Sequence, residues 1–376
     1  MNRTCFLHVG ANKTGSSSIQ EALFVKVSDP RFHYVSGLLA NGSLAFASVF
    51  HPSPENRWVF DSMGFGGEFE DFRGRISWLL NRQFQKARQK DRHVVVSAEV
   101  LWQSTPRGLS ELRDYLRRQG LETKVLVYLR HWIPWAGSLF QELVKGGRPD
   151  FALGIGIDAD ICSVRARLQG LFDVFGKDRV EVHLFDPRGF PDACVVRHFC
   201  GRIGMPLPQN GTYRHNEAFS LPAVQLRFAF NRFMGLEAEY RRPKPPGIAL
   251  LLERLSALRG VPFRLHSSFL SDWLSERQRE DEWIHAHTGL SLSDHVPPAD
   301  DPYSVATEAD LYRFAPATRE WIAEQVDQRV VRLPDGEAAA KAIALQVDAL
   351  RRKPPDFTER LTDWRRKARR VWVMYG

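Results

Sequence analysis

The sequence has few cysteines, no long apolar run and no beginning typical of a secretory signal. Its 376 residues include four cysteines, Cys5, Cys162, Cys194 and Cys200, without any C-x-x-C spacing. Neither a disulfide framework nor a zinc site is therefore indicated. No apolar stretch approaches the ~18 residues needed to span a bilayer, and the run 5–9 is too short for a signal-peptide core. We therefore expect a cytoplasmic protein.

The composition excludes a disordered chain and a polytopic membrane protein, because 43% of the residues are hydrophobic and 26% are charged. The formal net charge of +8 favours anionic partners without identifying one. Most of it lies near the end of the sequence, where residues 351–376 include nine basic and three acidic side chains. Since the rest of the chain is nearly neutral, we expect no nucleic-acid partner.

Short apolar runs alternate with helical patterns in the first half of the chain. The runs predict strands at 5–10, 93–97, 124–129 and 180–185. The helical patterns predict helices at 16–26, 69–89, 109–118, 134–145 and 161–175. Residues 30–66 are rich in Gly, Pro, Ser and Asn, which indicates loops and short strands. Strands separated by helices pair in parallel through right-handed crossovers, so we expect an α/β fold with a P-loop-like parallel sheet flanked by helices.

The alternation stops after about residue 235. A cluster of breakers at 243–247 precedes helical patterns at 248–258, 268–287, 316–329, 335–351 and 357–373. We therefore expect an α/β core over 1–235 and a mainly helical C-terminal region over 236–376. The pattern at 357–373 is amphipathic and basic. Two interpretations remain open for it: a helix packed on the body with a solvated basic face, or peripheral association with an anionic membrane or acceptor.

The segment after the first predicted strand has the pattern of a phosphate-binding loop. The strand ends at Gly10, and a helix follows a turn that is rich in hydroxyls and carries one lysine. Backbone N–H groups and the positive helix end converge there on a place where an anion can lie. The candidate ligands are Lys13, Thr14, Gly15, Ser16, Ser17 and Ser18. A Walker A loop has glycine immediately before its lysine, so an ordinary NTPase loop is disfavoured, and a plain Ser-capped helix is the alternative.

A second pair of residues follows a later strand. Arg130 comes directly after the apolar run 125–129, and Ser138 lies eight positions further on, in the next predicted helix. A guanidinium at a strand end and a hydroxyl on the following helix can hold a second phosphate from two sides. Taken alone, the pair also fits a surface arginine and an ordinary helix serine.

Together the two elements resemble the sulfotransferases that use 3′-phosphoadenosine 5′-phosphosulfate (PAPS). In that family the loop after the first strand holds the 5′-phosphosulfate, and an Arg-x7-Ser element holds the 3′-phosphate. The sequence is most similar to a bacterial, carbohydrate-type group whose loop reads His-x-Gly-x-x-Lys-Thr-Gly, as it does from His8 to Gly15. Further matching segments are 97–99, 128–130, 138–141 with Lys145, 175–176, 180–186 and 216–220. The resemblance covers roughly residues 4–232 and does not include the Arg-Lys-Gly loop that completes the 3′-phosphate pocket in animal members.

The resemblance implies a sulfotransferase fold and sulfuryl transfer from PAPS, the co-substrate, to an acceptor hydroxyl without a metal. Lys13 would stabilise the charge on the leaving phosphate. Glu99 is the expected general base, because its strand ends at the same edge of the sheet as the strands before the loop and before Arg130. A structural ion pair or a helix cap is the alternative for Glu99, and His33 and His51 are rival bases. The likeness to carbohydrate-type members favours a hydroxyl on a glycan or glycolipid.

Two other functions remain open from the sequence. A P-loop nucleotide or small-molecule kinase shares the sheet and the loop, and it predicts Mg²⁺ dependence and an aspartate at a strand end. Asp186 ends a predicted strand, but late in the chain. A non-catalytic protein that binds through its basic tail predicts salt-sensitive binding and no turnover.

Overall fold

The structure is a computed structural model that describes residues 3–11, 13–25, 27, 29–50, 69–151, 163–206, 218–234, 246–294, 303–357 and 359–360. The chain divides into two compact units. The first unit comprises Met1–Trp132, Asp158–Asn216 and Glu276–His295, and the second comprises Ile133–Ile157, Glu217–Ser275 and Val296–Gly376. Segments from both sides of residue 235 thus contribute to each unit.

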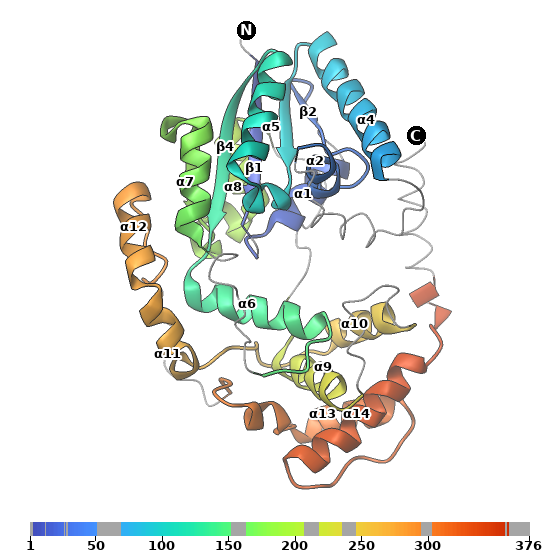
Figure 1. The fold of residues 1–376 in the computed structure, drawn as a ribbon. Coiled ribbons are helices and arrows are strands. Elements are labelled where there is room, and N and C mark those ends of the chain that lie inside the picture. The colour runs from blue at the N-terminus through green and yellow to red at the C-terminus, as the bar shows by residue number, and fades with distance from the viewer. Residues whose placement is uncertain are drawn as a thin grey trace. The chain divides into compact units, whose positions relative to one another are not determined.

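The first unit is built around a five-stranded parallel sheet in the order β2-β3-β1-β4-β5 (Figure 1). The strands are β1 (Arg3–Gly10), β2 (Phe32–Tyr34), β3 (His93–Ser97), β4 (Leu121–Leu129) and β5 (Val180–Leu184). The central strand β1 pairs with β3, where His8 lies beside Ser97, and with β4, where Gly10 lies beside Tyr128. The sheet confirms the expected α/β class.

Helices cover both faces of this sheet. On one face, α1 (Ser16–Val25) and α8 (Val195–Ile203) form a core with β4, in which Leu23, Tyr128 and Phe199 are buried. On the other face lie α5 (Pro106–Arg118) and α7 (Val164–Phe175) (Figure 1). Since both faces are covered, the central strands are continuous apolar runs such as Val94–Val96, whose side chains are fully buried.

The edge of the sheet beside β3 carries two further helices. The long helix α4 (Phe69–Gln89) contacts β3, and α2 (Ser43–Phe50) contacts α4. Helix α2 falls within the segment 30–66, for which the sequence indicates loops and short strands. It was not expected because its residues Leu44–Ser48 are buried all round and show no amphipathic period.

The second unit is helical in its described part. It contains most of α6 (Trp132–Lys145) and most of α11 (Ser267–Glu276), together with α9 (Leu221–Met234), α10 (Ile248–Ala257), α13 (Pro316–Gln325) and α14 (Glu337–Arg352). Helix α9 packs along α14 and is buried from Leu221 to Asn231. Within the described ranges, no helix has the length and apolarity needed to cross a membrane.

One helix predicted over 268–287 is two helices, so this prediction is wrong. Helix α11 ends at Glu276, and α12 (Gln278–Thr288) begins after Arg277. The two belong to different units, apart from the last residue of α11. The sequence did not reveal the break, because no glycine or proline stands there. At the break Arg277 is buried, and its guanidinium lies 5.7 Å from the centre of the Trp132 ring.

Candidate anion-binding site

A tight loop joins β1 to α1 at the carboxyl edge of the sheet. Lys13 and Gly15 both have left-handed backbone conformations, with φ of 67° and 78°. A Cβ atom on Gly15 would lie 2.8 Å from Phe185 Cε2 and 3.0 Å from Val195 Cγ1. Only glycine therefore fits between this loop, the end of β5 and the start of α8. The loop's shape is fixed by packing from the first unit itself.

Ser16 begins α1 with a hydroxyl that is buried but not hydrogen-bonded. The residue is 2% exposed, and its Oγ has no partner within the described part of the chain. The amides of Ser18 and Ile19 donate to the Gly15 carbonyl oxygen at 3.0 and 3.4 Å, so the helix has begun there. A buried hydroxyl without a partner is costly, and it stands here at the positive end of a helix. An anionic oxygen at this place would satisfy it.

The other hydroxyls of the loop have different surroundings. Thr14 is fully buried and donates from Oγ1 to the Ala11 carbonyl oxygen at 2.6 Å, so its side chain closes the loop and leaves only its backbone for a ligand. Ser17 is half-buried and Ser18 is 7% exposed. The candidate site is thus made of backbone N–H groups and serine hydroxyls rather than of the threonine hydroxyl.

Arg130 binds the loop from β4. Its Nη1 donates to the Lys13 carbonyl oxygen at 3.0 Å, and its guanidinium lies 5.4 Å from the centre of the Phe185 ring. Burial lowers the pKa of Arg130 to about 10, so the group stays charged at neutral pH. A charged guanidinium in a partly buried place is stabilised by a bound anion.

Glu99 lies at the same edge, directly after β3. It begins a 3₁₀ turn, Glu99–Gln103, and is half-buried. A Cβ atom built on Gly10 would collide with Ser16 Oγ and would lie 3.2 Å from Glu99 Cγ. The Glu99 side chain and the first hydroxyl of α1 therefore both lie close to the space where a Cβ of residue 10 would stand, and glycine leaves that space open. The parallel sheet brings these groups together because β1 and β3 end at the same edge.

His33, one of the two rival bases, does not join this group. His33 lies on β2 level with Val94, before the carboxyl end of β3. Burial, with Lys86, Arg92 and Lys90 near it, lowers the pKa of His33 to about 4. His51 lies outside the described residues.

Ser138 lies on α6, in the part of that helix that belongs to the second unit. Within the same unit, Gln141 Oε1 accepts a hydrogen bond from the Phe219 amide at 2.8 Å. The Lys145 ammonium lies 4.2 Å from the centre of the Phe219 ring. Gln141 and Lys145, which both belong to the matching residues of α6, therefore contact Phe219.

The residues around Leu292 pack at the end of β4, which the sequence did not indicate. The Leu292 carbonyl oxygen accepts the Trp132 amide at 3.0 Å and lies 3.3 Å from His131 Nδ1. The carboxylate of Asp281 stabilises the backbone there, because it accepts hydrogen bonds from the Leu292 amide at 2.6 Å and from the Ser291 hydroxyl at 2.8 Å. The same segment carries the buried Arg277, so a second cation lies near the residues that follow Arg130.

A kinase-type metal site finds little support in the described residues. Asp186 follows β5, but both of its carboxylate oxygens accept hydrogen bonds from Arg188, at 2.7 to 3.1 Å. These bonds hold the pKa of Asp186 below its usual value. No group of three or more metal-ligating side chains is found in the parts of the chain that the structure describes.

Comparison with known proteins gives one similar structure. No protein-family model and no curated protein matches this sequence. The structure is similar to the crystal structure of a sulfotransferase from Alicyclobacillus acidocaldarius, at 19% sequence identity and a TM-score of 0.37. The similarity covers 64% of this chain and 97% of the other. The function is therefore inferred from the sequence motifs and from the geometry of the β1–α1 loop.

Proposed function

We propose that this protein is a PAPS-dependent sulfotransferase, which acts on a hydroxyl of a carbohydrate or glycolipid. The observation that carries the proposal is the buried hydroxyl of Ser16, which has no hydrogen-bond partner among the described residues. It lies at the start of α1, in a loop that Arg130 holds by the Lys13 carbonyl. An anionic group at this point would satisfy the hydroxyl and the first amides of the helix together.

The residues present fit a phosphosulfate, because they are cations and hydrogen-bond donors. Lys13, Ser16 and the backbone of residues 14–18 would hold the 5′-phosphosulfate, with Ser17 and Ser18 as further donors. By the resemblance of its motif, Arg130 would bind the 3′-phosphate. The co-substrate supplies the sulfuryl group, whose bond to the 5′-phosphate oxygen breaks as its bond to the acceptor oxygen forms.

Glu99 takes the proton of the acceptor hydroxyl in this proposal. It is a half-buried residue whose Cγ lies close to Gly10 and so near the start of the loop. The Lys13 ammonium would stabilise the charge that collects on the leaving phosphate. Both groups act from loops that follow adjacent strands of one sheet, which keeps their separation fixed during the reaction.

Transfer of radioactive sulfate from PAPS to a panel of oligosaccharides and glycolipids tests the proposal. We expect Glu99→Gln to lower turnover about a hundredfold or more, while binding of adenosine 3′,5′-bisphosphate changes little. The matched control is Glu111→Gln, which removes an exposed carboxylate on α5 that pairs with Arg107. Full turnover by Glu99→Gln would show that the base is assigned wrongly.

A further inference from the structure

Helix α4 carries an unusual concentration of positive charge. From residue 73 to residue 90 the sequence has six basic side chains and no acidic one: Arg73, Arg75, Arg82, Lys86, Arg88 and Lys90. On α5, by contrast, Arg107 forms an ion pair with Glu111 at 3.0 Å. Helix α4 therefore stands out by its run of basic side chains without an acidic one.

The solvent face of α4 presents a row of three cations around a tryptophan. Ile76, Leu80, Phe84 and Ala87 are buried and form the opposite face of the helix. Arg75, Trp78, Arg82 and Lys86 follow one another at spacings of three, four and four residues, so they share one side of the helix. We call these four residues the α4 row. Trp78 is 58% exposed, and the guanidinium of Arg82 lies 4.8 Å from the centre of its ring.

The cations of the α4 row are not neutralised locally. Arg75, Arg82 and Lys86 form no ion pair with a carboxylate of the described residues, whereas Arg73 pairs with Glu70 at 3.4 Å. Of these three cations, Lys86 also acts on the interior: burial lowers the pKa of His33, and Lys86 adds to the shift together with Arg92 and Lys90. This side of the unit thus has an excess of positive charge that can attract an anion.

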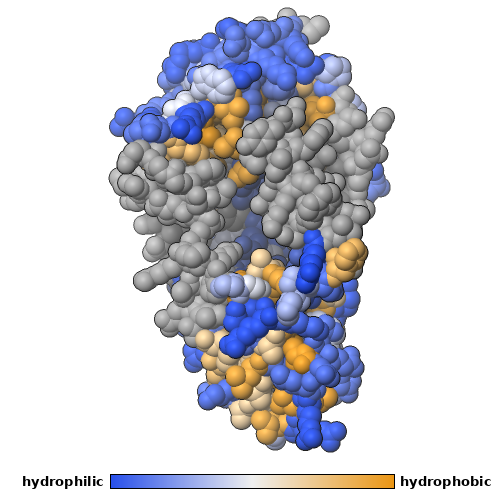
Figure 2. Space-filling view, turned by 90° about the vertical axis from the view of Figure 1, so that its right-hand side faces the viewer, coloured by the Kyte–Doolittle hydropathy of each residue, from blue (hydrophilic) through white to orange (hydrophobic). Residues whose placement is uncertain are grey.

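An open depression on the surface of the same helix is lined by Leu79, Arg82, Gln83, Gln85, Lys86 and Gln89. Gln83 fixes the helix to the turn after β2, since its amide exchanges two hydrogen bonds with the backbone of Gly37, at 3.1 and 3.2 Å. Figure 2 faces the side that bears α4 in Figure 1, and its upper part is mainly hydrophilic.

We propose that the α4 row binds a carbohydrate chain that carries carboxylate or sulfate groups. The cations would pair with the anionic groups, and the exposed ring of Trp78 would pack on the apolar face of a sugar ring. The exposed amides of Gln85 and Gln89 both donate and accept hydrogen bonds, so they suit sugar hydroxyls. A membrane is a poorer fit, because the apolar face of α4 is buried in the protein and only Trp78 and Leu79 could enter a bilayer.

The row leads toward the candidate site. Helix α4 ends at Gln89, and β3 begins at His93, so the helix runs antiparallel to the strand and its first turns lie toward the carboxyl edge (Figure 1). Arg75 and Trp78 are therefore nearer than Lys86 to the edge where Glu99 lies. A long acceptor could extend from Glu99 onto the row. This link to the acceptor depends on the proposed function, but anion binding by the row does not.

Fluorescence anisotropy with labelled chains tests the proposal on the full-length protein. The probes are dextran sulfate, hyaluronan, uncharged dextran, an oligothymidylate and vesicles that contain an anionic phospholipid. The variant is the triple substitution Arg75→Gln, Arg82→Gln and Lys86→Gln. Its control is Arg107→Gln, Arg117→Gln and Arg118→Gln on α5, which removes the same charge from exposed positions of the same unit.

We expect the triple variant to bind dextran sulfate and hyaluronan about tenfold more weakly, and the α5 control to bind them as the parent does. Trp78→Ala should weaken both probes several-fold without any change in charge. Equal losses in the two triple variants would overturn the proposal. So would equal affinity for uncharged dextran, or tighter binding of the oligothymidylate or of the vesicles.

Titration of the same proteins with adenosine 3′,5′-bisphosphate separates this proposal from the proposed function. We expect the α4 triple variant to bind the bisphosphate as the parent does. If no variant binds the bisphosphate while the anionic sugars show the expected pattern, the α4 row stands and the sulfotransferase proposal fails. If the bisphosphate binds but the anionic sugars bind all variants equally, the sulfotransferase proposal stands and the proposal for the α4 row fails.

Discussion

Arg130 donates a hydrogen bond from Nη1 to the main-chain oxygen of Lys13 at 3.0 Å, although 117 positions separate the two residues. The bond joins the end of β4 to the loop after β1, which are neighbouring strands of the sheet. It also leaves the Lys13 side chain outside this contact, because only the carbonyl oxygen takes part. The fold of the sheet therefore helps to hold the loop in its conformation.

Gly15→Ala should destabilise the first unit and abolish anion binding. The new Cβ would lie 2.8 Å from Phe185 and 3.0 Å from Val195, and φ of 78° is strained for alanine. We expect a loss of about 2 kcal/mol in unfolding free energy, measured by urea denaturation. Gly74→Ala on α4 is the control, since its Cβ would meet nothing within 4 Å. That control should gain up to about 1 kcal/mol, and equal losses in the two variants would contradict the account.

Ser16→Ala and Thr14→Val should separate binding from stability. The Ser16 hydroxyl has no partner in the described part of the chain, so its removal should leave the unfolding free energy unchanged or slightly higher while weakening anion affinity. The Thr14 hydroxyl donates to Ala11, so Thr14→Val should cost about 1 kcal/mol of stability. Denaturation and calorimetric titration of both variants measure the two effects. A stability loss in Ser16→Ala larger than in Thr14→Val would show that Ser16 is a structural residue.

His8 should make the first unit sensitive to acid. Its side chain is fully buried, with Nδ1 2.7 Å from Ser97 Oγ, and burial lowers its pKa to about 3. Histidine in the unfolded chain has a pKa of about 6.5 and so binds a proton that the folded state excludes. The contribution of His8 to the free energy of unfolding is therefore fully present above about pH 6.5, and it is lost as the pH falls toward 3. His8→Gln should reduce the slope by about 1.4 kcal/mol per pH unit between about pH 6 and pH 4.

Urea denaturation of the parent and of His8→Gln at several pH values measures this slope. Carboxylates also titrate in the window, but they are common to both proteins. Identical slopes would mean that His8 is protonated in the folded state.

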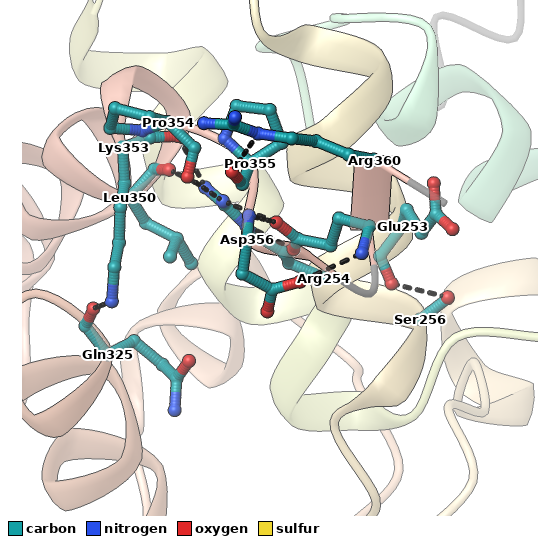
Figure 3. Close-up of polar contacts among 11 residues, drawn as sticks. Glu253, Arg254, Ser256, Gln325, Leu350, Lys353, Pro354, Pro355, Asp356 and Arg360 are labelled. Atoms are coloured by element: carbon teal, nitrogen blue, oxygen red, sulfur yellow. Dashed lines mark hydrogen bonds and ion pairs between the residues drawn. The ribbon is translucent and has the colours of Figure 1, made fainter. Parts of the chain in front are cut away.

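Arg254 on α10 should be a main support of the second unit. Its three side-chain nitrogens donate to five acceptors: the carbonyl oxygens of Leu350, Lys353 and Pro354, and both carboxylate oxygens of Glu359 (Figure 3). The bonds to Arg254 hold the pKa of Glu359 below its usual value. Because the Arg254 side chain is only 9% exposed, Arg254→Ala should cost about 3 kcal/mol in thermal or urea unfolding.

Arg313→Ala is the control for Arg254→Ala, since Arg313 pairs with Asp310 but has a side chain that is 67% exposed. It should cost less than about 1 kcal/mol. Comparable losses would contradict the role of Arg254. Asp356 and Glu359 also exchange side-chain to backbone hydrogen bonds at 2.8 Å in a capping box. Most of the basic helix predicted over 357–373 lies outside the described residues.

The spacing of apolar residues was sufficient to predict helices with one buried face, and continuous apolar runs were sufficient to predict strands of a sheet that is covered on both faces. The helix predicted over 69–89 has the same bounds as α4, because the apolar spacing of Ile76, Leu80 and Phe84 is unambiguous. The strand expected over 93–97 coincides with β3 for the same kind of reason. Helices α2 and α9 were missed, since both are buried on nearly every side and lack a polar face.

The residues of the candidate site that are contiguous in sequence were predicted, whereas the contacts that depend on tertiary structure were not. The pattern at Lys13–Ser18 indicates a phosphate loop because its turn, its lysine and its hydroxyls are contiguous in sequence. The different surroundings of Thr14 and Ser16 depend on which hydroxyl meets the Ala11 carbonyl, and no spacing specifies that. Arg277 lies far along the chain in a helical pattern, so its position near Trp132 required the tertiary structure.

The central claim is that the β1–α1 loop and Arg130 form a site for PAPS, and calorimetric titration with adenosine 3′,5′-bisphosphate tests it most directly. We predict tight binding without metal, lost in Arg130→Ala and weakened in Ser16→Ala, and no comparable binding of ATP with Mg²⁺. Binding of ATP with Mg²⁺ but not of the bisphosphate would contradict the account and favour a kinase.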